Sequence, residues 1–369
     1  MTRARELGNL GSNTTGLEAI NAVYDAGGLT GRNLIINGAM QVAQRGTSQA
    51  SITSTGYTTL DRFRCVVQYA TFTKSQSTDV PSGQGFASSL KMACTTSASP
   101  AASNIIRVDQ RIEGQNLQQL KKGTANAESL TLSFWVKSNK TGTYIVELSD
   151  EDNSRHICKS YTISSSGVWQ KVELTYSGDT SGAFDNDNAV SLGVHFWLGG
   201  GSDYTGGTLA TSWASLTAAN RAVGQVDFAD SNTNEWYITG VQLEVGETAT
   251  PFEHEDYGTT LGKCQRYLKL GGAGVYGIYN SATNIEISIP FSPDMRAAPT
   301  LSMAKTTVTI SNKTNSNTAD ATSVSATNIS ASPSGAFFAQ IGNCNVTSAS
   351  SGHIAQFRTD EFLQLDAEL

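Results

Sequence analysis

Two stretches of the sequence carry aromatic residues where they could stack on a ligand. Residues 130–137 read LTLSFWVK, and the apolar residues fall on every second position, so Trp135 lies on the opposite strand face. Residues 190–198, VSLGVHFWL, leave His195 and Trp197 opposite their apolar set. An exposed indole leaves apolar area in water. We therefore expect a sugar ring, a loop or another subunit to cover these rings, with His195 as a polar contact if the ligand is a glycan.

Two further aromatic residues lie between predicted strands. Tyr204 and Trp213 belong to the stretch 199–218, whose Gly, Ser and Thr content predicts a long loop. Aromatic residues in such a loop either contact a ligand or close the edge of a sheet. They are secondary candidates for carbohydrate binding.

Two acidic clusters could support glycan cleavage or hold calcium. The segments 150–152 (DED) and 185–187 (DND) lie in turn-like stretches, where Asp and Asn are favoured by local backbone conformation. Hydrolysis needs two carboxylates about 5–10 Å apart across a cleft, which a sequence does not reveal. The segment 185–188 lacks the glycine and distal glutamate of a complete calcium loop. We favour turns, and expect no catalytic residue and no cofactor; structural calcium stays an unsupported alternative.

Cysteine and histidine give no sign of a metal site or a nucleophile. The five cysteines are scattered without a CxxC pair, and the four histidines have no metal-ligand spacing. GxSxG and HExxH motifs are absent, and the GAGVYG stretch at 272–277 precedes a strand pattern rather than a helix. We predict that the chain is not an enzyme and that Cys264 is a buried free thiol rather than half of a disulfide.

Composition predicts an all-β protein. Only 15% of the 369 residues are charged, Gly is abundant at 35 residues, and Ser, Thr and Asn are frequent. The formal charge of −7 without a long basic run argues against nucleic-acid binding. No stretch approaches the about 20 apolar residues of a membrane span, and the N-terminus lacks the apolar centre of a secretory signal. We expect no membrane insertion and synthesis in the cytoplasm.

The patterns divide the chain into three parts. Residues 1–32 predict a short helix with one apolar stripe, which must pack on copies of itself or on a docking partner because so short a helix is unstable alone. Residues 33–257 show strict period-two alternation between turn clusters, typical of an antiparallel β-sandwich. Residues 258–369 predict a small β-domain, and 305–335 have so few large apolar residues that neighbouring subunits would complete its core. A disordered stalk is the alternative for that part.

Several phrases in order resemble tail-fibre and receptor-binding proteins of tailed bacteriophages, of the marine and cyanophage type. They are NLIINGAMQVAQRGTS at 33–48, YTTLDRFR at 57–64, LTLSFWVKS at 130–138, SSSGVWQKVELTY at 164–176, and ITGVQLEVGETATPFEH at 238–254 followed by CQRYL at 264–268. In that family the phrases frame a jelly-roll domain similar to carbohydrate-binding modules.

This resemblance implies a virion component made in the host cytoplasm. By it, the chain would be a homotrimer, attach to other tail or virion proteins through its N-terminus, and recognise a bacterial surface glycan through the jelly roll. Two other classes stay open. One is a glycan depolymerase, and the other is a purely structural decoration or adaptor protein of the virion.

Overall fold

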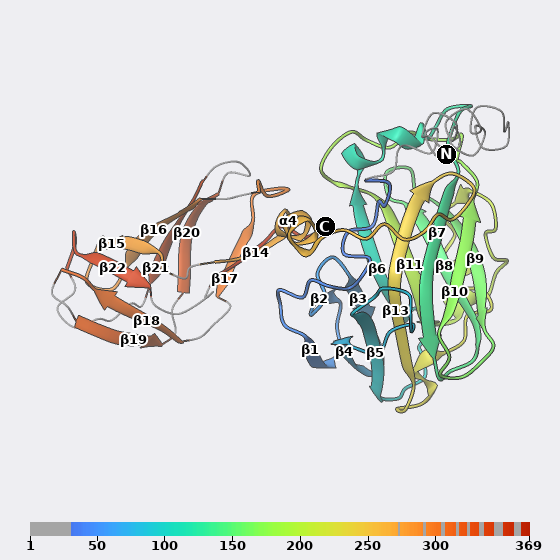
Figure 1. The fold of residues 1–369 in the computed structure, drawn as a ribbon, viewed down its shortest axis with the longest axis horizontal. Coiled ribbons are helices and arrows are strands. Elements are labelled where there is room, and N and C mark those ends of the chain that lie inside the picture. The colour runs from blue at the N-terminus through green and yellow to red at the C-terminus, as the bar shows by residue number, and fades with distance from the viewer. Residues whose placement is uncertain are drawn as a thin grey trace, which may run out of the picture. The chain divides into compact units, whose positions relative to one another are not determined.

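The computed structural model describes residues 31–271, 274–290, 293–303, 307–314, 317–322, 325–331, 336–342, 350–357 and 363–369. The predicted N-terminal helix lies outside the described residues. The chain divides between Glu255 and Asp256 into two compact units. We call the described residues before this point the sandwich unit and those after it the C-terminal unit (Figure 1).

The sandwich unit consists of two antiparallel sheets, which confirms the predicted all-β jelly-roll class (Figure 1). Sheet A has six strands in the order β1 (Ser48–Ile52), β4 (Thr71–Ser77), β5 (Ser89–Thr96), β13 (Glu235–Val245), β7 (Leu130–Ser138) and β10 (Gln170–Tyr176). Sheet B has seven in the order β12 (Ala214–Ser215), β9 (Arg155–Ile163), β8 (Gly142–Asp150), β11 (Val190–Gly200), β6 (Ile105–Glu113), β3 (Arg64–Val67) and β2 (Gly56–Tyr57). The short helix α3 (Ser202–Thr205) follows β11, and 3-10 turns occupy Gly114–Asn116, Gln118–Leu120, Ala218–Asn220 and Phe228–Asp230.

The predicted period-two patterns form the core between the two sheets. The apolar positions of β7 are at most 5% exposed, and those of β11 from Leu192 to Leu198 are at most 1% exposed. Phe134 of β7 meets Phe196 of β11 edge to face at 5.3 Å between ring centroids, which joins sheet A to sheet B. The alternation therefore identified the buried face of both strands correctly.

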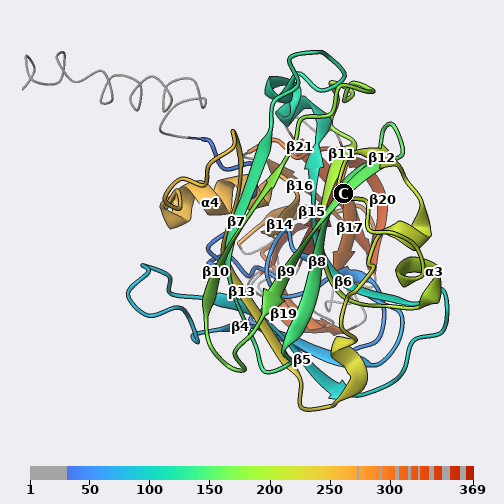
Figure 2. The ribbon, with the colours of Figure 1, turned by 90° about the vertical axis from the view of Figure 1, so that its right-hand side faces the viewer.

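The outer face of sheet B carries a second, smaller apolar cluster under a loop. Parts of the loop 201–222, including α3 and the turn Ala218–Asn220, lie over this face, while β12 pairs with β9 at the edge of the sheet. They place Tyr204 and Ala222 against Trp197 of β11. Figure 2 shows α3 on the outer side of β6 and β8. Sheet B is thus packed on both faces, unlike a sheet with one solvated side.

Two of the sequence segments that resemble bacteriophage fibre proteins, 33–48 and 238–254, form hydrogen bonds with each other and so close the sandwich. Asn33 donates from Nδ2 to the carbonyl of Val241 at 3.1 Å and accepts from the backbone of Leu243 at 3.1 Å. Beyond β13 the chain folds back, and the Glu253 carboxylate accepts from the backbone N–H of Asn33 at 3.0 Å. The start and end of the unit are therefore tied together, which gives the TPFEH phrase a structural role.

The C-terminal unit begins with helix α4 (Tyr257–Gln265), whose N-cap Asp256 accepts from the backbone of Thr259. One antiparallel sheet has the order β14 (Leu268–Gly271), β23 (Leu363–Asp366) and β17 (Thr300–Met303). The other has the order β19 (Asn317–Thr322), β18 (Thr307–Asn312), β22 (Ile354–Phe357), β15 (Tyr276–Tyr279), β16 (Ile285–Pro290), β21 (Ala336–Gly342) and β20 (Ser325–Ala331). The C-terminal unit therefore has the fold of the predicted small β-domain. Its strands are found in the part of the chain for which a disordered stalk was the alternative.

Two further predictions concern Cys264 and membrane-spanning segments. Cys264 is a fully buried thiol that is not part of a disulfide, as expected. Among the described residues, no helix is both long and apolar enough to cross a membrane.

Candidate functional site

His195 and Trp197 do not lie on an open sheet face, which corrects the prediction that they contact a glycan there. They point away from the core, as the alternation requires, but both are 0% exposed. The ring of Tyr204 covers Trp197 at 5.6 Å between centroids, and the guanidinium groups of Arg107 and Arg221 lie 5.7 and 5.4 Å from it. Of the three expected covers, a sugar, a loop or another subunit, the loop is the one observed. The two guanidinium groups and the Tyr204 ring already cover the Trp197 indole.

Glu147 of β8 organises the polar groups beneath that loop. Its buried carboxylate accepts from Trp197 Nε1 at 3.0 Å, from His156 Nδ1 at 3.0 Å, and from Arg221 at 2.8 and 3.0 Å. Burial alone would raise the pKa of Glu147, but the hydrogen bond from His156 and the charge of Arg221 hold this pKa well below its usual value. The carboxylate is therefore ionised and fully paired.

Three side chains in this region have the types and spacing of metal ligands. One ligand atom each from Glu147, His156 and Cys158 lies within 4.8 Å of the others. However, Arg221 already donates two hydrogen bonds to Glu147, and burial raises the pKa of the Cys158 thiol. A metal ion would have to displace the guanidinium, so we interpret the cluster as an ion-pair network.

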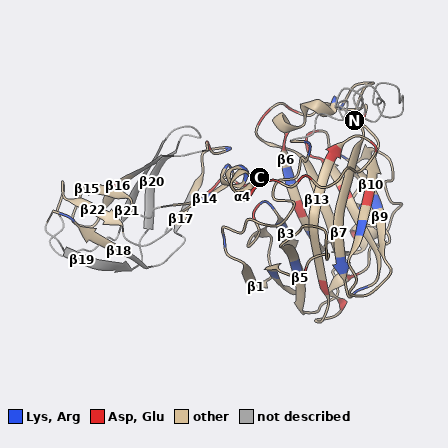
Figure 3. Ribbon diagram, in the orientation of Figure 1, with Lys and Arg blue, Asp and Glu red and all other residues tan. Residues whose placement is uncertain are grey.

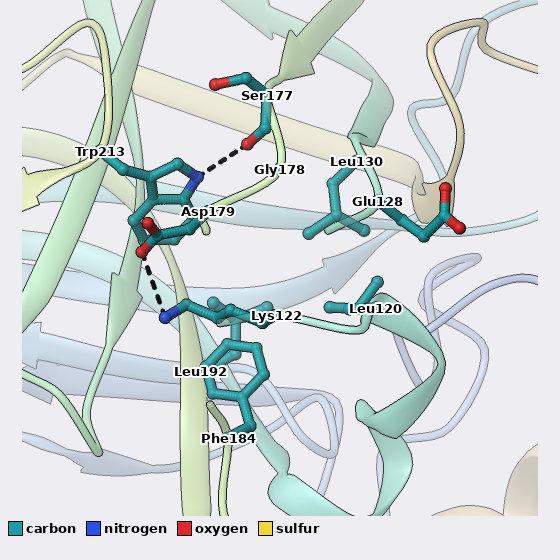
Figure 4. Close-up of a pocket in the computed structure, with 10 residues that line it drawn as sticks. All are labelled: Leu120, Lys122, Glu128, Leu130, Ser177, Gly178, Asp179, Phe184, Leu192 and Trp213. Carbon is teal, nitrogen blue, oxygen red and sulfur yellow. Dashed lines mark hydrogen bonds and ion pairs between the residues drawn. The ribbon is translucent and has the colours of Figure 1, made fainter. Parts of the chain in front are cut away.

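Trp213 lies in a different place, beside a buried lysine. It packs against the main core, and its indole N–H donates to the carbonyl of Ser177 at 2.7 Å (Figure 4). Lys122 Nζ lies 5.6 Å from its ring centroid and 2.5 Å from the carboxylate of Asp150. The pocket lined by Trp213, Lys122 and Ser177 has room for about one water molecule, too little for a sugar ring. Trp213 therefore closes the edge of the sandwich rather than lining a glycan pocket.

The acidic turns also have local partners. Asp150 is fully buried against Lys122, whose ammonium also donates to the carbonyls of Ser181 and Gly182 at 2.9 and 2.7 Å. Asp187 accepts from the backbone of Ala189 at 2.9 Å, as a turn residue does. The ammonium group of Lys122 therefore lies among these carbonyl and carboxylate oxygens. It supplies the positive charge that a calcium ion would otherwise bring.

The outer face of sheet A carries two partly exposed tryptophans, Trp135 and Trp169, beside the buried Tyr237. Trp135 of β7 is partly exposed there, as predicted, opposite Lys171 of β10 and Thr239 of β13. Trp169, just before β10, is also partly exposed and meets Tyr237 of β13 edge to face at 6.1 Å. We call Trp135, Trp169 and Tyr237 the aromatic face.

Charged groups lie between and around these rings. Lys137 places Nζ 4.3 Å from the Tyr237 centroid and 5.5 Å from that of Trp169, and it pairs with Asp79. Asp79 also accepts from Trp169 Nε1 at 2.9 Å, and the hydrogen bonds from Lys137 and Trp169 lower its pKa although burial acts to raise it. Both signs of charge occur along the strands of the unit (Figure 3). Flat rings with charged hydrogen-bonding groups at their edges can stack on a sugar ring and bond its hydroxyls.

The sequence prediction missed Trp169 and Tyr237, although a signal for the first was present. Val172, Leu174 and Tyr176 mark the buried positions of β10, and extending their alternation backwards puts Trp169 on the outer face. Tyr237 is harder to place, because β13 shifts register between Thr239 and Gln242, and this bulge reverses which positions face outwards.

Comparisons with known proteins give no family for the chain. No protein-family model matches it, and no curated protein matches it. Among solved structures it is similar to the enzymatically active domain of tailspike protein 4 of bacteriophage CBA120, with 13% identity and a TM-score of 0.31 over 58% of this chain and 21% of that one. The chain thus spans about a fifth of that tailspike structure.

Two carbohydrate-binding structures are also similar to the chain. One is the family 11 carbohydrate-binding module from Clostridium thermocellum in complex with a mixed-linked tetrasaccharide, with 13% identity and a TM-score of 0.26 over 55% of this chain and 98% of that one. The other is the tandem CBM22 domain from Paenibacillus barcinonensis Xyn10C, with 10% identity and a TM-score of 0.27 over 91% of this chain and 95% of that one. At these TM-scores the likenesses carry no argument about ligand or activity.

Proposed function

We propose that the chain is a virion attachment protein of a tailed bacteriophage, a tail-fibre or receptor-binding protein that recognises a glycan on the host surface. The aromatic face carries the binding part of this proposal, because Trp135 and Trp169 remain partly exposed with polar groups beside them. The ordered phrases of the sequence support the virion part. The protein binds the glycan without cleaving it.

A sugar ring would lie against the indoles with its apolar C–H side. Its hydroxyl groups would then meet Asp79 and Glu235, whose side chains are 43% and 41% exposed, and Lys91, which pairs with Glu235 at 2.7 Å. Carboxylates and ammonium groups together can accept from and donate to neighbouring hydroxyls. The aromatic rings supply affinity, and these polar groups supply orientation.

The same rings could instead contact another subunit, since interfaces also select Trp and Tyr. A separate surface on the C-terminal unit suits the proposed homotrimer better. Tyr276 and Ile278 of β15 and Ile354 of β22 are 58%, 57% and 48% exposed, and Ile278 pairs directly with Ile354. Adjacent large apolar side chains on one sheet face favour a covered surface.

We predict that the double substitution Tyr276→Ser, Ile278→Ser dissociates the trimer or shifts it toward monomer at low concentration. The physical reason is the loss of apolar area that assembly would bury. Sedimentation velocity measures the outcome. Tyr257→Ser is the matched control, because Tyr257 is 55% exposed but lies on α4. An unchanged trimer in the double variant would place the interface elsewhere.

The N-terminal segment is proposed to attach the protein to the particle. A chain that begins at Gly31 should keep its fold and its trimeric state but fail to enter virions, since the sandwich is closed by residues from Asn33 onward. Incorporation into particles is measured by complementation of a fibre-deficient phage. Normal incorporation of the shortened chain would rule out this role.

A glycan array probed with the full chain tests the proposed function against its two alternatives. Saturable binding to host-type glycans without new reducing ends supports an attachment protein. Reducing ends that disappear with Asp187→Asn identify a depolymerase, for which Asp150 is unsuitable because it is buried against Lys122. Absence of binding to any glycan indicates a purely structural part of the virion.

A further inference from the structure

Two ion pairs flank Tyr237 on the outer face of sheet A, and in both of them the carboxylate is the more exposed partner. The Lys137 side chain is 12% exposed, against 43% for its partner Asp79. The Lys91 side chain is 25% exposed, against 41% for its partner Glu235. The surface around the ring therefore presents its carboxylates to solvent more than its ammonium groups.

Tyr237 holds both lysines in this arrangement. In the sheet it lies opposite Lys137 of β7 on one side and opposite Lys91 of β5 on the other. The two Nζ atoms lie 4.3 and 5.2 Å from the centroid of its ring, whose negative face attracts cations. Its hydroxyl donates to Glu235 Oε2 at 2.7 Å. Because Tyr237 is only 6% exposed, it acts as a positioning residue, and stacking on a sugar is left to the two tryptophans of the aromatic face.

Both carboxylates are ionised and can accept further hydrogen bonds. Burial acts to raise the pKa of Glu235, but hydrogen bonds from Lys91 and Tyr237 lower this pKa below its usual value, as happens for the pKa of Asp79. Lys137 and Trp169 each reach a different oxygen of Asp79, and Lys91 and Tyr237 each reach a different oxygen of Glu235. A carboxylate has about four lone-pair sites, so exposed acceptor sites remain on both groups for the donors of a ligand.

The surrounding charges have the same sign. On β10, the third ion pair of this face joins Lys171 to Glu173, and here too the carboxylate is the more exposed partner. The chain as a whole has a formal charge of −7. A ligand that approaches the aromatic face therefore meets exposed negative groups first, and like charges brought together across an interface oppose binding.

We propose that the aromatic face selects glycans without acidic groups, and that Asp79 and Glu235 set this preference. The inference rests on the proposed function and names the substrate class of the same site. Hydroxyl groups of neutral sugars and ammonium groups of amino sugars both donate to a carboxylate, whereas a uronate or a phosphate is repelled by it. The indoles stack on a pyranose ring whatever its charge, so the discrimination comes from the carboxylates beside them.

A glycan array in which each neutral oligosaccharide is matched by amino, uronate and phosphorylated forms of the same backbone tests the preference with the full chain. We expect binding to neutral or amino forms and at least about tenfold weaker binding to the acidic forms. The tighter of the neutral and amino forms identifies the donor. Equal or tighter binding of an acidic form would overturn the preference while leaving glycan recognition intact. Absence of binding to every member would reject the proposed function and this inference together.

Charge-neutralising variants assign the preference to its residues. Asp79→Asn and Glu235→Gln keep the size of the side chains, and each should lower the ratio of neutral to uronate affinity about tenfold without changing the melting temperature appreciably. Glu128→Gln is the matched control, because Glu128 also pairs with a lysine, Lys121 at 2.5 Å, but precedes β7 at the end opposite Lys137. Added salt should reduce the discrimination of the wild type, since exposed charges are screened. An affinity ratio unchanged in both face variants, or changed equally in the control, would contradict the assignment.

Discussion

Replacing Glu147 by Gln is expected to lower the free energy of unfolding by about 3–5 kcal/mol, the usual cost of breaking a buried ion pair on one side. Glutamine keeps the shape of the side chain but removes the charge that compensates Arg221, whose side chain is 13% exposed. It also replaces one acceptor oxygen by a donor among the N–H groups of His156, Trp197 and Arg221. Chemical denaturation of the two proteins measures the difference.

Glu173→Gln is the matched control. Glu173 is also a strand glutamate paired with a cation, Lys171 at 2.7 Å, but its side chain is 51% exposed. Exposed pairs contribute about 0–1 kcal/mol, so this variant should be nearly as stable as the wild type. Similar losses in both variants would mean that the Glu147 network does not hold the loop over sheet B.

The stability difference between wild type and Glu147→Gln should depend on pH. The pKa of Glu147 is lowered in the folded state, so its contribution is present above the ordinary glutamate value of 4.5 and is lost as pH falls toward the folded pKa. We therefore expect the two unfolding curves to differ most near neutral pH and to converge below about pH 4.5. A difference that is constant with pH would contradict the assigned charge state.

Alternation along the strands predicted the sandwich core, because the period-two pattern is local and depends only on which face is buried. The same pattern put His195 and Trp197 on the outer face correctly. It could not show that residues 201–222 cover that face, since the loop is held by non-local hydrogen bonds such as those from Ala222 N to Tyr204 O and from Gly207 N to Ala219 O. Outward direction and exposure to solvent are separate properties.

The sequence pattern also could not predict the ion-pair network around Glu147. In β8, Glu147 alternates with buried apolar residues and therefore has the pattern of a solvated strand position. Its partners come from β9, β11 and the loop, at sequence separations of 9, 50 and 74 residues. Only the three-dimensional register of the strands and the loop brings them to one carboxylate.

Replacing Trp135 or Trp169 by Ala is expected to weaken glycan binding by about 1–3 kcal/mol, the scale of losing one aromatic platform. Both rings are partly exposed and neither belongs to the main core, so the melting temperature should change little. Trp169→Phe separates stacking from hydrogen bonding, because it keeps a ring but loses the N–H that binds Asp79. Val168→Ala, at a neighbouring residue with 54% exposure, is the control.

The most direct test of glycan recognition by the aromatic face is to measure two quantities on the Trp135→Ala and Trp169→Ala variants, the affinity for the host glycan and the melting temperature of the assembled protein. Our account predicts a loss of affinity of about tenfold for each 1.4 kcal/mol, with the melting temperature nearly unchanged. A melting temperature lowered by several degrees with intact glycan affinity would contradict it, and would assign these rings to a subunit interface instead.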